Sequence, residues 1–146
     1  MKICRRIILL VLTMSFLFVF SCKTNEKKNG TAQANGDLSK YELVAEAATK
    51  QCPIMLDEIT RLDSVQYNAK EHALVYNYSI MNIKKSDLPA KAADITAGMM
   101  RDAMLSGLKA QPALDMFRKD KVKIVYVFKD KEGKELFVFD FKHTEY

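Results

Sequence analysis

The densest group of polar side chains in the sequence lies between residues 57 and 63. Asp57, Arg61 and Asp63 stand there together with Glu58 and Thr60. Two carboxylates with an arginine between them could clamp an anion or a polar substrate. The alternative is an ionic and hydrogen-bonded joint between a helix and a strand, because a planar guanidinium can satisfy a carboxylate and backbone carbonyls together. We favour the joint, since structural ion-pair networks contain the same residue types.

No second group of residues in the sequence supports catalysis or metal binding. His72 and His143 are the only histidines, and neither has a cysteine or a carboxylate at the spacing of metal ligands. The sequence contains neither a G-x-S-x-G motif nor a phosphate-binding loop. We therefore expect no metal and no cofactor, and catalysis is the less favoured interpretation.

The amino-terminal segment has the pattern of a secretory signal peptide. Lys2, Arg5 and Arg6 precede an apolar run from Ile7 to Phe20, which ends just before Cys22. The run has 14 residues, whereas a membrane-spanning helix needs about 20. A short apolar run behind positive charges is typical of a signal peptide. The alternative is an uncleaved anchor in which the cysteine has no role.

The residues Val19-Phe20-Ser21-Cys22 resemble the lipobox of bacterial lipoproteins. The resemblance implies that residues 1–21 are removed and that Cys22 becomes the first residue, with a diacylglyceryl group on its sulfur and an acyl group on its amine. Two or three acyl chains hold a protein almost irreversibly on a membrane, because each buried methylene adds about 0.8 kcal/mol. The residue after the cysteine is Lys23, whereas an acidic residue at this position often retains such proteins in the inner membrane or directs them elsewhere. The absence of an acidic residue resembles the pattern of outer-membrane lipoproteins that face the periplasm.

Composition and charge divide the remaining chain into a tether and one domain. Residues 22–37 carry no aliphatic side chain larger than alanine and are expected to form a flexible tether that reaches roughly 20 Å. Residues 38–146 are enough for a single core. They carry 17 of the 23 basic residues and 16 of the 18 acidic residues, without a basic stripe, and nucleic acid is therefore excluded as a partner.

The domain begins with a helix that has clear start and stop signals. Ser39 and Glu42 form a capping box, and Leu38 and Leu43 are spaced for a hydrophobic staple. Apolar residues then recur at helical spacing as far as Cys52, where the following proline ends the helix.

The rest of the domain alternates between hairpins and helices. We expect strands at 62–67 and 74–81, a helix after Pro89 that extends to residue 109, a short helix from Pro112, and strands at 121–129 and 136–142. The order is helix, two strands, helix, short helix, two strands. Two consecutive hairpins predict an α+β fold with a four-stranded antiparallel sheet and with its helices on one face.

The opposite face of this sheet is the second candidate for a functional surface. Alternation in the strands places four valines on it, together with a polar rim: Val75, Val125, Val127 and Val138. An apolar centre with a polar rim is typical of a protein interaction surface. The alternative is that valines are ordinary residues of a β-strand.

The stretch from Cys52 to Val65 resembles a family of small exported bacterial domains. The shared pattern is P-x-x-x-D-x-x-T-R-L-D-S-V before a tyrosine-rich strand. The resemblance extends over most of residues 50–142 and implies export and a common fold, but no activity. We therefore expect a lipid-anchored protein of the cell envelope with a non-catalytic domain that binds an envelope protein. The alternative is a small enzyme or ligand-binding domain that uses Asp57, Arg61 and Asp63.

Overall fold

The computed structural model describes residues 39–146. The predicted signal peptide, Cys22, the tether and the staple residue Leu38 lie outside the described residues. The helices are α2 (Lys40–Thr49), α3 (Ala90–Lys109) and α4 (Asp115–Lys119), and two 3₁₀ turns are η2 (Lys85–Asp87) and η3 (Pro112–Leu114). The strands are β1 (Ile54–Met55), β2 (Thr60–Asn68), β3 (Ala73–Ile80), β4 (Lys123–Asp130) and β5 (Glu135–Phe141).

Helix α2 starts and ends close to the positions that the sequence predicts. The capping box is present, because the Ser39 side chain accepts from the Glu42 amide and the Glu42 carboxylate accepts from the Ser39 amide. The helix ends at Thr49, three residues before Cys52. The Thr49 hydroxyl accepts from the amide of Val65 at 2.8 Å and donates to the carbonyl of the same residue. These two bonds fix the end of α2 on strand β2.

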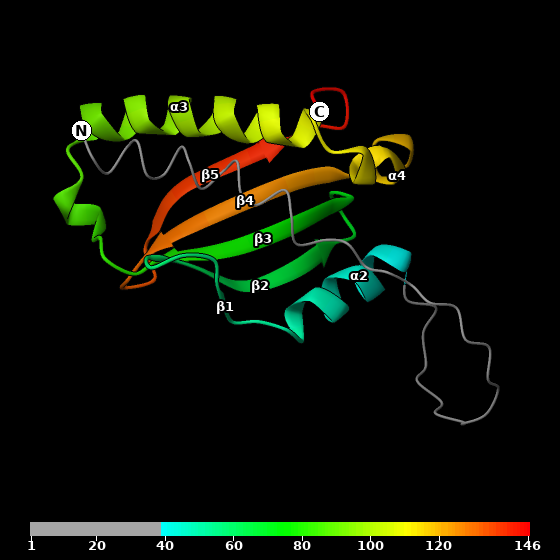
Figure 1. Ribbon diagram of the computed structural model, residues 1–146, viewed down its shortest axis with the longest axis horizontal. Helices are drawn as coiled ribbons and strands as arrows, with labels where there is room; N and C mark the ends of the chain where they lie inside the picture. Colours follow the sequence, from blue (N-terminus) through cyan, green and yellow to red (C-terminus); the bar gives the residue numbers. More distant parts are fainter. Residues whose placement is uncertain (1–38) are drawn as a thin grey trace.

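The strands form one mixed sheet of five strands in the order β1-β2-β3-β4-β5 (Figure 1). The predicted four-stranded antiparallel sheet is therefore wrong in two details. The two-residue strand β1 pairs with β2, and β3 runs parallel to β4. The parallel pair has a simple cause: helix α3 occupies the connection between the two hairpins and returns the chain to the end at which β3 starts. The α+β class is confirmed.

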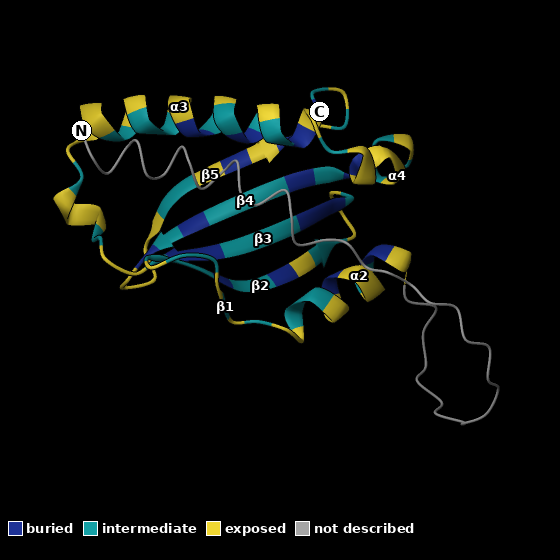
Figure 2. Ribbon diagram, in the orientation of Figure 1, coloured by how far each residue is buried: buried dark blue, intermediate teal, exposed yellow. Residues whose placement is uncertain are grey.

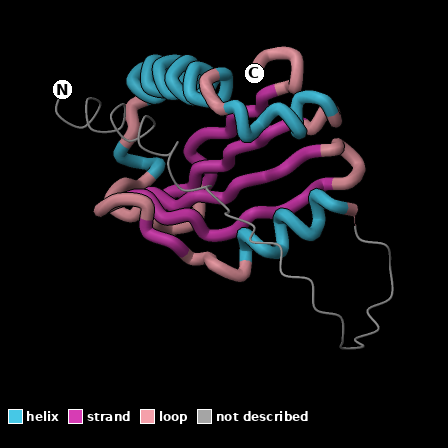
Figure 3. The backbone as a smooth tube through the Cα atoms, turned by 45° about the vertical axis from the view of Figure 1, so that its right-hand side comes forward, coloured by secondary structure: helices cyan, strands magenta, loops and turns pink. Residues whose placement is uncertain are grey.

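The helices pack on one face of the sheet. Helix α2 contacts β2, whereas α3 lies on the same face along the edge strand β5 (Figures 1 and 3). The core on this face combines three residues of α3, Met100, Met104 and Leu108, with residues of the central and edge strands. The core residues of the sheet are Leu62, Val65, Leu74, Tyr78, Ile124, Phe128, Phe139 and Phe141. Figure 2 shows that burial is greatest in this layer between helices and sheet.

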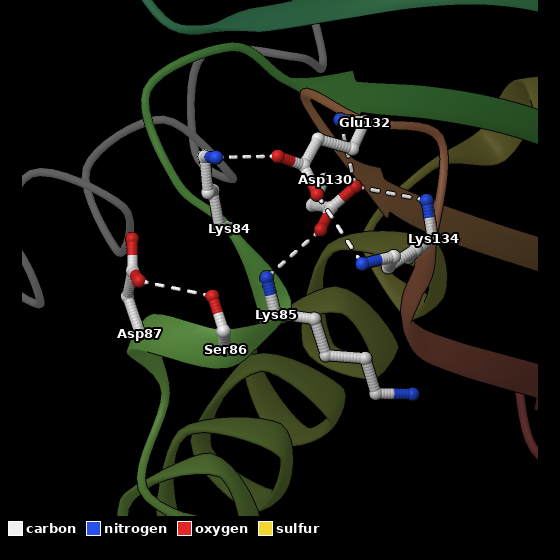
Figure 4. A network of polar contacts seen from close by, with 7 residues as sticks. All are labelled: Lys84, Lys85, Ser86, Asp87, Asp130, Glu132 and Lys134. Carbon is white, nitrogen blue, oxygen red and sulfur yellow. Dashed lines mark hydrogen bonds and ion pairs between the residues drawn. The ribbon is translucent and has the colours of Figure 1, made fainter.

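A buried carboxylate fastens the end of strand β4. Asp130 is only 1% exposed. Its Oδ1 accepts from the amides of Glu132 and Lys134, and its Oδ2 accepts from the amide of Lys85, each at 2.8 Å (Figure 4). The Lys84 ammonium lies 2.5 Å from the Glu132 carboxylate beside it. Asp130 thus joins the β4–β5 turn to the segment that leads into α3.

Two glycines, Gly98 in helix α3 and Gly133 in the turn between β4 and β5, offer a simple test of backbone effects on stability. A Cβ atom added at Gly98 would meet no atom within 4 Å, so close approach to the sheet does not explain this glycine. Gly98→Ala is therefore expected to stabilise the domain by about 1 kcal/mol, because alanine loses less backbone entropy in a helix. Gly133 has a φ of +82°, so Gly133→Ala should destabilise the domain instead. Urea unfolding of both variants measures the two signs, and a loss of stability in Gly98→Ala would contradict the expectation.

Candidate functional site

Asp57 serves the turn that precedes strand β2. Its Oδ1 accepts from the amide of Ile59 at 2.7 Å and from the amide of Thr60 at 2.9 Å. An aspartate that closes a turn in this way replaces backbone hydrogen bonds that the turn lacks. Among the described residues, its side-chain hydrogen bonds are to these two amides. The structure therefore does not join Asp57 to Arg61 in one ionic group.

Arg61 and Asp63 form a separate pair on β2. The Arg61 Nε lies 2.5 Å from Asp63 Oδ1, and the hydroxyl of Ser79 donates to Asp63 Oδ2 at 2.5 Å. The register between β2 and β3 shifts between Leu62 and Ser64, which brings the Asp63 carboxylate within reach of both partners. Both oxygens of Asp63 thus have partners. This geometry favours the structural interpretation of the polar group over a substrate clamp.

Cys52 lies near this pair but lacks the properties of a reactive thiol. Its Sγ is 3.4 Å from the carbonyl of Ala48, and the side chain is half-buried against the core. Burial and, second, the nearby Asp63 carboxylate raise the pKa of the Cys52 thiol. A raised pKa leaves less of the nucleophilic thiolate at neutral pH. Cys52 is therefore not activated as a nucleophile in this structure.

The sheet face opposite the helices carries the four valines side by side. Val75 pairs with Val125 across β3 and β4, and Val127 pairs with Val138 across β4 and β5. Val125 and Val127 are two residues apart on β4 and therefore point to the same face. The four side chains form one continuous group, the valine patch (Val75, Val125, Val127 and Val138). Val138 is 47% exposed and stands on the edge strand β5.

Polar residues border the valine patch on the same face of the sheet. Gln66 and Asp140 end the row that contains Val75 and Val125. In the next row, the Asn77 side chain lies beside Val127 and donates to the Ser64 hydroxyl at 3.2 Å. The arrangement is an apolar centre with hydrogen-bonding groups around it, as in many protein interfaces.

A network that the sequence analysis missed lies at the other end of the strands. The Tyr67 hydroxyl is 2.5 Å from His72 Nδ1, and His72 Nε2 is 2.8 Å from the carbonyl of Asp120. A carbonyl only accepts, so Nε2 donates to it, and in the neutral imidazole Nδ1 then accepts from the Tyr67 hydroxyl. The Asp120 carboxylate in turn accepts from the Tyr41 hydroxyl and from the Lys40 ammonium.

The groups of this network are engaged with one another. Burial and, second, the hydrogen bond to Asp120 raise the pKa of Tyr41, so this hydroxyl stays protonated at neutral pH. The hydrogen bond from Lys40, followed by the one from Tyr41, lowers the pKa of Asp120. The backbone of His72 has a φ of +49°, a constraint that a sequence pattern does not reveal. The network therefore joins α2, the β2–β3 turn and the segment before β4.

Two general features of the described residues bear on the site. Among residues 39–146, no helix is both long and apolar enough to cross a membrane. In the same part of the chain, no group of three or more histidine, cysteine, aspartate or glutamate side chains is placed to hold a metal ion.

Comparison with known proteins gives a family and a fold. Residues 36–137 match the family described as Domain of unknown function (DUF8479), and the chain belongs to this family. The structure is similar to the crystal structure of a "putative secreted protein" from Pseudomonas aeruginosa, with a TM-score of 0.56 and 13% sequence identity. The similarity covers 71% of this chain and 87% of the Pseudomonas chain, and at this identity it shows the fold alone. No curated protein matches the sequence.

Proposed function

We propose that the chain is a lipid-anchored protein of the bacterial cell envelope, whose folded domain binds a protein partner through the valine patch. The anchor is Cys22, and the membrane is the outer membrane with the domain facing the periplasm. The signal peptide pattern and the lipobox-like residues 19–22 support the anchor. The description of the Pseudomonas protein as secreted agrees with export.

The observation that carries the binding role is the continuity of the valine patch. Isolated valines on an open sheet need no explanation, because much of any protein surface is apolar. Here the register places all four side chains next to one another on the face opposite the helices. Water on such a group is released when a partner covers it, which favours association.

A protein partner fits this surface better than a small molecule does. The patch lies on strands, and a small molecule binds in a concave site that covers most of its surface. Polar groups such as Asn77 and Asp140 at the border would set the orientation of a partner more than its affinity. The carboxylates that a catalytic alternative would need, Asp57 and Asp63, have their partners within the domain.

The double variant Val125→Lys with Val127→Lys tests the binding role. Neither side chain lies in the helix-covered core, so we expect the variant to fold, with circular dichroism and a melting temperature close to those of the parent. A partner would have to bury two ammonium groups without counter-charges, which costs several kcal/mol. Envelope crosslinking to the partner should therefore fall by at least about tenfold.

A matched control separates the patch from exposed apolar residues in general. Ile95 and Met99 are exposed on helix α3, away from the sheet face. The double variant Ile95→Lys with Met99→Lys should keep every crosslink. A patch variant that folds and keeps its crosslinks would contradict the proposal, and one that unfolds would show that Val125 and Val127 belong to the core.

A further inference from the structure

Four segments meet at the end of the domain where the described chain begins. Lys40 of α2 lies against Asp120, and the carbonyl of His72 accepts from the amide of Lys123 at 2.9 Å. The hydroxyl of Tyr146 donates to the carbonyl of Val122 at 2.5 Å. The start of α2, the β2–β3 turn, the segment from α4 to β4 and the carboxyl terminus therefore share one end of the sheet (Figure 1).

Five carboxylates near this end of the sheet have a hydrogen-bond or ion-pair partner. Four of them are in ion pairs: Asp120 with Lys40, Glu71 with Lys123, Asp115 with Arg118, and Glu145 with Arg101. The fifth, Glu42, accepts from the neutral Ser39 amide in the capping box and keeps its negative charge. Asp140 on β5 is exposed and has no ion pair within the described residues.

Four lysines at the same end have no such match. Within the described residues, no hydrogen bond or ion pair engages the ammonium groups of Lys70, Lys119, Lys121 and Lys142, and all four residues are exposed. We call these four residues the basic end. Only two side-chain carboxylates without a cationic partner, Glu42 and Asp140, stand against these four lysines, so this end keeps an excess of positive charge that attracts anions.

At the opposite end of the sheet, positive and negative side chains are more evenly mixed. The exposed lysines Lys85 and Lys131 stand there with exposed carboxylates, those of Glu58, Asp87 and Glu135. Charges of both signs next to one another largely cancel beyond a Debye length of about 8 Å. The weak net charge of the domain, +1 over residues 38–146, is therefore unevenly distributed.

We propose that the basic end docks on the anionic phospholipid headgroups of the membrane that holds the Cys22 anchor. This inference rests on the proposed anchor. The first described residue, Ser39, lies at the same end of the sheet as these lysines, and the predicted tether of 15 residues, 23–37, would span roughly 20 Å. Such a tether would hold this end of the domain near the headgroups.

The physical gain of docking is electrostatic and is shared among the four lysines. A lysine close to an anionic membrane surface strengthens binding by about fivefold, and the effect disappears within a Debye length. The tether also raises the local concentration of the surface, so that a weak interaction is sufficient. The docked orientation leaves the strands, and the valine patch between their ends, outside the contact.

The test measures lysine reactivity on vesicles. The mature lipidated chain, checked by intact mass, is placed on vesicles of phosphatidylcholine with about 30% phosphatidylglycerol, and on phosphatidylcholine alone. An amine-reactive reagent and mass spectrometry give the acetylation rate of each lysine. On the anionic vesicles, Lys70 and Lys142 should react at least about threefold more slowly, and about 0.5 M NaCl should restore their rates. Lys91 and Lys131, outside the basic end, should react equally on both.

Paired variants identify the charges responsible. Lys119→Gln with Lys121→Gln should abolish the protection of Lys70 and Lys142, whereas Lys91→Gln with Lys131→Gln should preserve it. Equal rates on the two vesicles, or equal slowing of all lysines, would overturn the docking of the basic end. A mature chain without acyl groups would instead contradict the anchor. Co-sedimentation of that chain with anionic but not neutral vesicles would then decide the basic end separately.

Discussion

The variant Cys22→Ala is expected to leave the membrane fraction entirely or to remain as an unprocessed precursor. In the lipoproteins that residues 19–22 resemble, the sulfur of the cysteine at this position receives the diacylglyceryl group. Acyl chains of ordinary length contribute roughly 10 kcal/mol each, at about 0.8 kcal/mol per methylene. Docking by a few lysines is reversible and salt-sensitive and cannot replace them. Metabolic labelling with palmitate, followed by membrane fractionation, measures both consequences.

Cys52→Ala is the matched control for this experiment. Cys52 is half-buried against the core of the folded domain and keeps its thiol protonated. The control variant should therefore carry as much palmitate as the parent and should stay in the membrane fraction. Palmitate that persists in Cys22→Ala would contradict the lipid anchor at Cys22. Palmitate that is lost from Cys52→Ala would show that Cys52 carries the lipid instead.

The second large effect is expected at Asp130, where a single carboxylate organises two loops. Asp130→Ala removes the acceptor of three backbone amides in a region that is almost closed to water. A buried amide without an acceptor is costly, and three of them together should lower the melting temperature by roughly 10 °C or more. Thermal unfolding followed by circular dichroism measures the effect.

Asp130→Asn separates the two loops from each other. The remaining side-chain oxygen can still accept from the amides of Glu132 and Lys134, because both contact the same oxygen, Oδ1. The new NH₂ group then faces the Lys85 amide, and two donors cannot bond. We expect a smaller loss of melting temperature than in the alanine variant. Hydrogen exchange should increase at the Lys85 amide but not at that of Lys134.

Asp130 also makes a defined contribution to acid sensitivity. The amide of Lys85, followed by those of Lys134 and Glu132, lowers the pKa of the Asp130 carboxyl against the opposing effect of burial. A carboxyl with a lowered pKa in the folded state stabilises the fold above its unfolded pKa, which is about 4, and loses this contribution as pH falls through the folded value. Asp130→Asn should therefore lose less stability than the parent as the pH falls below about 4. Equal acid sensitivity in both proteins would contradict this assignment.

The sequence by itself determined the main helices of this domain, four of its five strands and the faces of those strands. The capping box at Ser39 and Glu42 marks the start of α2 because its two hydrogen bonds join residues three apart. The alternation in 121–129 and 136–142 fixed which side chains meet the helices, since a strand has a period of two. Both signals are local, so they can be recognised in the sequence without any knowledge of distant contacts.

Only the tertiary structure decided how the strands are ordered and what the polar residues do. Local patterns do not tell whether a second hairpin adds parallel or antiparallel to the first; the path of α3 between β3 and β4 does. Asp57 and Asp63 are close in sequence, yet one closes a turn and the other binds Arg61 and Ser79 on a neighbouring strand. The His72–Asp120 contact joins residues that are 48 apart in the sequence. The basic end likewise brings together three separate segments, and no spacing in the sequence predicts such an arrangement because it depends on how the whole chain folds.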